Sequence, residues 1–109
     1  MKTLIVNSKN YIDVIEMNDI VFFMADNCYT KVVTKDGHQY VVSQTLAKVC
    51  NETEARFIRV NQSYLVNVNF ISQVDKKRKT ILLKESSEVK FTISQKKLLE
   101  LITLCSKNS

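Results

Sequence analysis

Several residue types are missing or rare in this chain of 109 residues, which has no proline, no tryptophan, one glycine and one histidine. A single glycine excludes the glycine-rich loops that cradle nucleotide phosphates, and no flexible linker divides the chain. Neither a Gly-x-Ser-x-Gly turn nor a His-Glu-x-x-His motif occurs. The lone His38 follows Gly37, which favours an exposed turn residue over a catalytic base. We therefore expect one domain over residues 1–109 without catalytic activity, cofactor or small-molecule substrate.

Cysteines and long apolar runs are also scarce. Cys28, Cys50 and Cys105 are odd in number and widely spaced, so neither disulfides nor a metal site is expected, and Cys50 and Cys105 are interpreted as small core residues. No run approaches the roughly 18 apolar residues of a membrane helix, which predicts a cytoplasmic protein without a membrane partner. Sixteen Lys and Arg against eleven Asp and Glu give a net charge of +5, which favours polyanionic partners without identifying one.

What the chain does contain is alternation of apolar and polar residues with a period of two, typical of strands. The run Ile20–Met24 is apolar at every position, which predicts a strand covered on both faces. A hairpin is expected where two alternating segments flank Gly37, because glycine readily adopts the positive φ of a tight turn. The predicted strands are Ile20–Met24, Tyr29–Thr34, Gln39–Val42, Phe57–Val60, Ile71–Val74, Thr80–Leu83 and Val89–Ile93.

Two segments have helical spacing instead. Thr45 can cap a short helix with an apolar stripe at Leu46, Val49 and Cys50. Ser94 can cap a C-terminal helix that precedes a fraying tail, Ser106 to Ser109; its apolar face is formed by Leu98, Leu101, Ile102 and Cys105. The chain thus predicts a mostly β fold, in which several short antiparallel strands form small packed sheets with one short helix and a C-terminal helix.

The segment Phe57–Asn67 is the most informative for function. A strand runs into Asn61, Gln62 and Ser63 and then returns to apolar residues, so these three polar side chains should be displayed at a turn. Asparagine and glutamine can pair with two atoms of adenine in a major groove, and serine hydroxyls commonly contact phosphates. The alternative is that Asn61 and Asn67 bond their own turns while Gln62 is solvated.

A second polar cluster begins the C-terminal helix. Lys96 and Lys97 in a first turn oppose the helix dipole, and a phosphate bound there would resolve this conflict. Gln95 could reach a base edge from the same turn. Solvated lysines explain the same residues, because lysine tolerates exposed helical positions.

Two further turns could contribute. Asp26–Tyr29 connects two strands and could present Asn27 or Tyr29 on the same surface, although Asp-Asn is ordinary turn chemistry and such a tyrosine usually packs. The basic run Lys76–Lys79 is interpreted as a solvated turn that protects a sheet edge and that could touch backbone phosphate.

The order of these features resembles the LytTR family of DNA-binding domains over roughly residues 5 to 103. The most specific block is Phe57–Asn67, which resembles the family signature Phe-Ile-Arg-Val-His-Arg-Ser-Tyr-Leu-Val-Asn with two central positions changed. The other matching segments are Asp19–Phe23, Lys35–Gly37, Thr45–Leu46 and Thr92–Ser94.

The resemblance implies a bacterial transcription regulator that binds duplex DNA through loops in successive major grooves, typically at paired direct repeats, with a second copy on the DNA as a further partner. Members usually follow a receiver or other sensory domain in two-component response regulators. This chain is either a piece of such a regulator or a stand-alone regulator, and Met1 and the absence of a linker favour the second. On the matching positions, the implied base contacts are Asn27, Tyr29, Asn61, Gln62 and Gln95. The implied phosphate contacts are Arg59, Ser63, Lys96 and Lys97.

This chain departs from the family pattern at three of these positions. Asn61 and Gln62 replace the usual His-Arg, and Gln95 replaces an arginine, so two cationic contacts become neutral amides. Because arginine reads guanine and glutamine reads adenine, we expect weaker binding and a site that favours adenine. The alternative function is a protein-interaction module that kept the fold and lost most of its DNA affinity.

Overall fold

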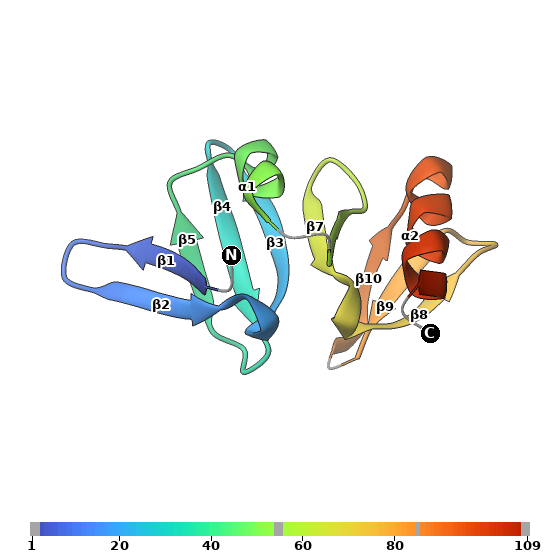
Figure 1. The fold of residues 1–109 in the computed structure, drawn as a ribbon, viewed down its shortest axis with the longest axis horizontal. Helices are drawn as coiled ribbons and strands as arrows, with labels where there is room; N and C mark the ends of the chain where they lie inside the picture. The colour runs from blue at the N-terminus through green and yellow to red at the C-terminus, as the bar shows by residue number, and fades with distance from the viewer. Residues whose placement is uncertain (1–2, 54–55, 85, 108–109) are drawn as a thin grey trace.

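The computed structural model describes residues 3–53, 56–84 and 86–107, which form an elongated molecule of 46 × 27 × 26 Å (Figure 1). Antiparallel strands dominate and two helices complete the fold, which confirms the predicted class. The strands form sheets of two, three and five members. Among the described residues, no helix is long and apolar enough to cross a membrane.

The five-stranded sheet has the order β5-β4-β3-β7-β6. Its central strand, β3, has apolar residues on both faces, as the run at Ile20–Met24 predicts. The turn between β4 and β5 contains Gly37 at φ 87°, so the predicted hairpin is confirmed. The five strands are β3 (Ile20–Asp26), β4 (Tyr29–Thr34), β5 (Gln39–Val42), β6 (Phe57–Arg59) and β7 (Tyr64–Asn67).

The three-stranded sheet has the order β10-β9-β8, and its β8–β9 hairpin confirms the predicted pairing across Asp75–Lys79. Its strands are β8 (Ile71–Asp75), β9 (Thr80–Leu83) and β10 (Ser86–Thr92). Short 3₁₀ helices at Met17–Asp19 and Val68–Phe70 lead into β3 and β8. Every strand of these two sheets except β7 thus overlaps a strand that the sequence predicts; the apolar residues after Ser63 were not assigned to a strand.

The two strands of the N-terminal hairpin were not predicted from the sequence. Strands β1 (Thr3–Asn7) and β2 (Ile12–Glu16) pair with each other alone and project from one end of the molecule (Figure 1). Val6 and Ile15 are buried against the five-stranded sheet, whereas Ile5 and Val14 are exposed. Apolar residues on both faces of this hairpin obscure the simple alternation of a half-buried pair.

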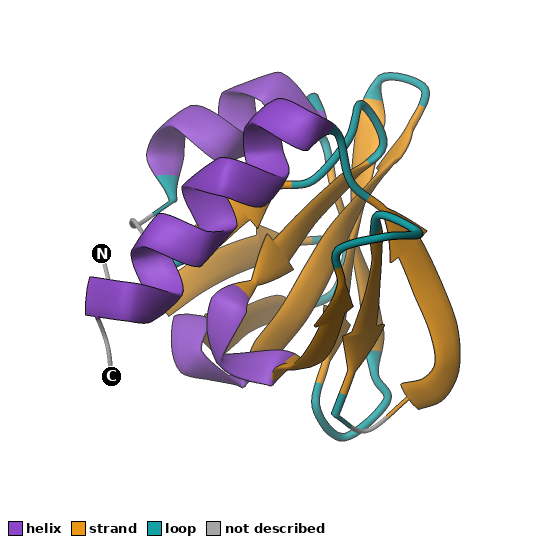
Figure 2. Cartoon of the chain, turned by 90° about the vertical axis from the view of Figure 1, so that its right-hand side faces the viewer, coloured by secondary structure: helices purple, strands orange, loops and turns teal. Residues whose placement is uncertain are grey.

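The two helices begin at the predicted caps. Helix α1 (Leu46–Glu52) starts after Thr45, whose hydroxyl accepts a hydrogen bond from the Lys48 amide at 3.3 Å. Helix α2 (Gln95–Lys107) starts after Ser94 and covers the three-stranded sheet (Figure 2). The helix continues through Ser106 to Lys107, so the prediction that the chain frays from Ser106 was wrong. No proline or glycine interrupts the helix before Lys107, and a lysine at its C-terminal end interacts favourably with the helix dipole.

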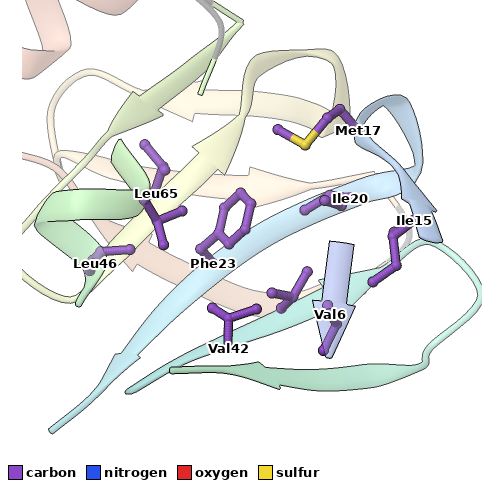
Figure 3. Close-up of a cluster of buried hydrophobic side chains, with 10 residues drawn as sticks. Val6, Ile15, Met17, Ile20, Phe23, Val42, Leu46 and Leu65 are labelled. Atoms are coloured by element: carbon purple, nitrogen blue, oxygen red, sulfur yellow. The ribbon is translucent and has the colours of Figure 1, made fainter. Parts of the chain in front are cut away.

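Two apolar clusters hold the fold together. The first lies between the five-stranded sheet, the β1–β2 hairpin and α1, with Phe23 and Leu65 among its fully buried members (Figure 3). The second lies under α2 and contains the predicted Leu98 and Leu101, whereas Ile102 is partly exposed. Cys50 packs partly against the first cluster, the side chain of Cys105 lies outside the described residues, and Cys28 is exposed.

Candidate nucleic-acid interface

The loop between β6 and β7 is shaped by the side-chain amide of Asn61. Its Oδ1 accepts hydrogen bonds from the backbone amides of Ser63 at 2.8 Å and Tyr64 at 3.1 Å. Its Nδ2 donates to the carbonyl oxygen of Thr92, 2.9 Å away at the end of β10. Asn61 thus bonds its own turn, as the alternative interpretation has it, and also connects this turn to the segment that enters α2.

The guanidinium of Arg59 fixes the next residue of the loop. Its Nη2 donates to the carbonyl oxygen of Gln62 at 3.1 Å, which holds the backbone on which the Gln62 side chain is mounted. Gln62 and Ser63 are exposed, whereas Asn61 and Arg59 are half-buried. The loop therefore exposes Gln62 and Ser63 on a backbone that is held by hydrogen bonds with Arg59 and Asn61.

The first turn of α2 carries the second predicted cluster. The Ser94 hydroxyl accepts a hydrogen bond from the Lys97 amide at 3.3 Å, and the Lys97 ammonium lies 3.1 Å from a carboxylate oxygen of Glu100. This ion pair offsets part of the conflict between Lys97 and the helix dipole. Gln95 and Lys96 are exposed, and Lys96 makes no ion pair with any described side chain.

The β3–β4 turn supplies the third predicted element. Asn27 adopts the left-handed φ of 56°, which asparagine tolerates better than most residues. Asn27 and Tyr29 are exposed, Tyr29 by 50%, so this tyrosine does not pack in the core. The backbone amide of Ala25 donates to the carbonyl oxygen of Ser63 at 2.8 Å, which joins this end of β3 to the β6–β7 loop.

These three segments, which are far apart in the sequence, form one edge of the molecule. Arg59, Gln62, Ser94 and Lys97 line a common surface depression together with Val60 and Asn61. The β3–β4 turn, the β6–β7 loop and the start of α2 follow one another along the upper edge in Figure 1. Four of the nine predicted contact residues, Arg59, Asn61, Gln62 and Lys97, thus line one depression, and the turn that carries Asn27 and Tyr29 adjoins the β6–β7 loop.

The lone histidine lies elsewhere. His38 is exposed at the β4–β5 turn, where its Nδ1 lies 2.9 Å from a carboxylate oxygen of Asp36. The Thr34 hydroxyl donates to the same carboxylate and lowers the pKa of Asp36. Among the described residues, no cluster of His, Cys, Asp and Glu could hold a metal ion.

The contact between Asn61 and Thr92 is the feature that sequence reasoning missed. The two residues are 31 positions apart, and no local pattern marks Thr92 as a partner for a loop asparagine. A polar residue in a turn is ordinarily explained by its own turn. Only the tertiary structure, which places the end of β10 beside the β6–β7 loop, reveals that Asn61 also holds the segment that enters α2.

We expect Asn61→Ala to lower the free energy of unfolding by about 1–2 kcal/mol, because several partly exposed hydrogen bonds are lost together. Urea unfolding followed by circular dichroism measures this change. Asn10→Ala, in the exposed β1–β2 turn, is the matched control and should change stability by less than about 0.5 kcal/mol. Equal stability of the two variants would show that the amide does not hold the loop.

Comparisons with known proteins identify the family of this chain and a similar structure. The sequence model of the LytTr DNA-binding domain matches residues 10–105. One similar structure is the LytTr DNA-binding domain of a Bacillus cereus protein described as a methyl-accepting/DNA response regulator; it is 18% identical, with a TM-score of 0.75, and the match covers 96% of this chain and 97% of that one. No curated protein matches the chain. The chain belongs to the LytTr DNA-binding domain family.

Proposed function

We propose that this LytTr domain, which belongs to a family that binds DNA in transcription regulation, recognises duplex DNA through three segments at its upper edge. These segments, called the three loops below, are the β3–β4 turn, the β6–β7 loop and the start of α2. The observation that carries the proposal is the bond from Asn61 to Thr92, which joins the β6–β7 loop to the start of α2. Because the β6–β7 loop and the start of α2 are joined, they can present Gln62 and Gln95 to the bases together while Lys96 and Lys97 contact the phosphate backbone of the DNA.

The proposal assigns different roles to the exposed side chains. Gln62 and Gln95 are the base-reading residues, because a glutamine amide can pair with both N6 and N7 of adenine. Asn27 and Tyr29 approach the bases from the third loop. Base contact by Asn61 stays a prediction, and it would require the amide to exchange its partners in the loop.

The phosphate contacts follow from charge and exposure. Lys96 is exposed and Ser63 displays its hydroxyl, so both can meet a phosphate directly. Lys97 and Arg59 already have partners, Glu100 and the Gln62 carbonyl, and a phosphate would compete with these or share the donors. We therefore assign the largest single phosphate contribution to Lys96.

The shape of the molecule suits a long DNA site. The three loops lie one after another along the long axis of the molecule (Figure 1). Loops spread along such an edge can enter successive major grooves on one face of the duplex. A second copy would occupy the neighbouring repeat where direct repeats are paired.

Salt dependence tests the proposal. Fluorescence anisotropy with a pool of random duplexes should show binding at low salt, and its affinity should fall by about 0.9 log units per phosphate contact for each tenfold rise in salt. Lys96→Gln should flatten this slope by about 0.9, whereas Lys9→Gln in the exposed β1–β2 turn should leave it unchanged. No binding at low salt would instead favour the protein-interaction module.

A further inference from the structure

The turn between β8 and β9 carries four consecutive cations, Lys76, Lys77, Arg78 and Lys79, all of them exposed. The one acidic residue of the turn, Asp75, accepts hydrogen bonds at Oδ1 from the backbone amides of Lys77 at 3.0 Å and Arg78 at 2.9 Å. This carboxylate therefore holds the turn in shape through its backbone. The result is a fixed turn with a high density of positive charge.

The position of this basic turn is set by its contacts with the end of β10. The backbone amide of Ile93 donates to the carbonyl oxygen of Lys79 at 3.0 Å, and Thr92 is paired with Thr80. Thr92 is also the residue whose carbonyl accepts the bond from Asn61. The basic turn thus lies on one side of the junction between β10 and α2, and the β6–β7 loop lies on the other (Figures 1 and 2).

The charges of the basic turn are not neutralised by any described acidic side chain. Lys31, Lys35 and Lys97 each lie within 4.0 Å of a carboxylate, but none of the four cations of the turn does so among the described side chains. Like charges placed next to one another repel, and a polyanion relieves this repulsion. Lys79 also adopts φ 54°, a left-handed backbone conformation that a glycine would adopt without strain.

We propose that the basic turn is a second phosphate-binding element, which contacts the DNA backbone beside the segment read by the three loops. The inference rests on the proposed function, since it concerns the same duplex. Contacts to phosphates carry no sequence information, so the turn contributes affinity and lengthens the footprint without changing base preference.

The test compares two double variants that remove the same charge. Lys77→Gln with Arg78→Gln neutralises the basic turn and leaves the backbone bonds to Asp75 available. Lys9→Gln with Lys84→Gln is the matched control, because both residues are exposed, Lys9 in the β1–β2 turn and Lys84 at the opposite end of β9 from the basic turn. Thermal unfolding confirms that both proteins are folded.

Binding is measured by anisotropy on duplexes of about three helical turns, one carrying a site selected by the wild-type protein and one scrambled. The turn variant should flatten the salt slope by about 1.8, for two lost contacts, and lower affinity at low salt by about tenfold on both duplexes. The control variant should keep the wild-type slope. Equal slopes for the two variants would overturn the inference, whereas absence of wild-type binding would overturn the proposed function itself.

Discussion

Replacing Gln62 by alanine should remove the preference for adenine at one position of the DNA site. The Gln62 side chain is exposed on a loop whose backbone is held by Arg59 and Asn61, so the amide can be presented to a base edge without ordering the loop first. A pair of hydrogen bonds from one side chain to one base discriminates by about 1–3 kcal/mol, which is roughly 5- to 150-fold. Selection of bound DNA from a random library, followed by sequencing, measures this loss.

Two further variants make the result specific to the amide. Gln62→Arg should move the preference at the same position from adenine to guanine, because the guanidinium matches O6 and N7 of guanine. Gln39→Ala, an exposed glutamine at the start of β5, should leave the selected site unchanged. A wild-type site dominated by guanine at the positions facing Gln62 and Gln95 would contradict the assignment of both glutamines.

Replacing Phe23 by alanine should lower the free energy of unfolding by about 3–5 kcal/mol, because a large cavity forms in a packed core. Phe23 is completely buried in the central strand β3 (Figure 3). Its ring centroid lies 5.5 Å from that of Phe57. A loss of this size is a large fraction of the stability of a domain of about 100 residues. Urea unfolding at constant temperature gives the value.

The matched control for this core variant is Val41→Ala. Val41 lies on β5 of the same sheet but is 53% exposed, so its truncation should cost less than about 1 kcal/mol. Phe23→Leu should fall between the two, since it removes less volume. If Phe23→Ala costs no more than Val41→Ala, the first apolar cluster does not stabilise the fold in the way that the structure indicates.

In strand β3, the periodicity of the sequence is not sufficient to predict which face of the sheet each residue occupies. Strict alternation would place Ile20 and Phe23 on opposite faces, yet both belong to the first cluster while Val21 and Phe22 contact the second. A register irregularity between Ile20 and Phe22 adds a residue and reverses the faces. Since every residue of this run is apolar, no polar position in the sequence marks where the irregularity occurs.

For the candidate interface, the sequence predicted the residue types and the local turns, because turn chemistry and helix capping are decided by neighbours in the chain. Asn61, Ser94 and Asn27 each lie in the kind of turn or cap that their local sequence predicts. The net charge of +5 and these polar side chains favour a polyanionic partner such as DNA. Their contact with DNA stays a prediction.

The sequence by itself determined that this is a mostly β chain with two capped helices, since alternation, turn residues and caps act over a few positions. Only the tertiary structure decided that the three loops lie on one edge and that the basic turn adjoins it. The physical reason is that these neighbours are joined by hydrogen bonds over long sequence separations. The bond from Ala25 to Ser63 forms when β3 pairs with β7, and the bond from Asn61 to Thr92 forms when the end of β10 lies beside the β6–β7 loop.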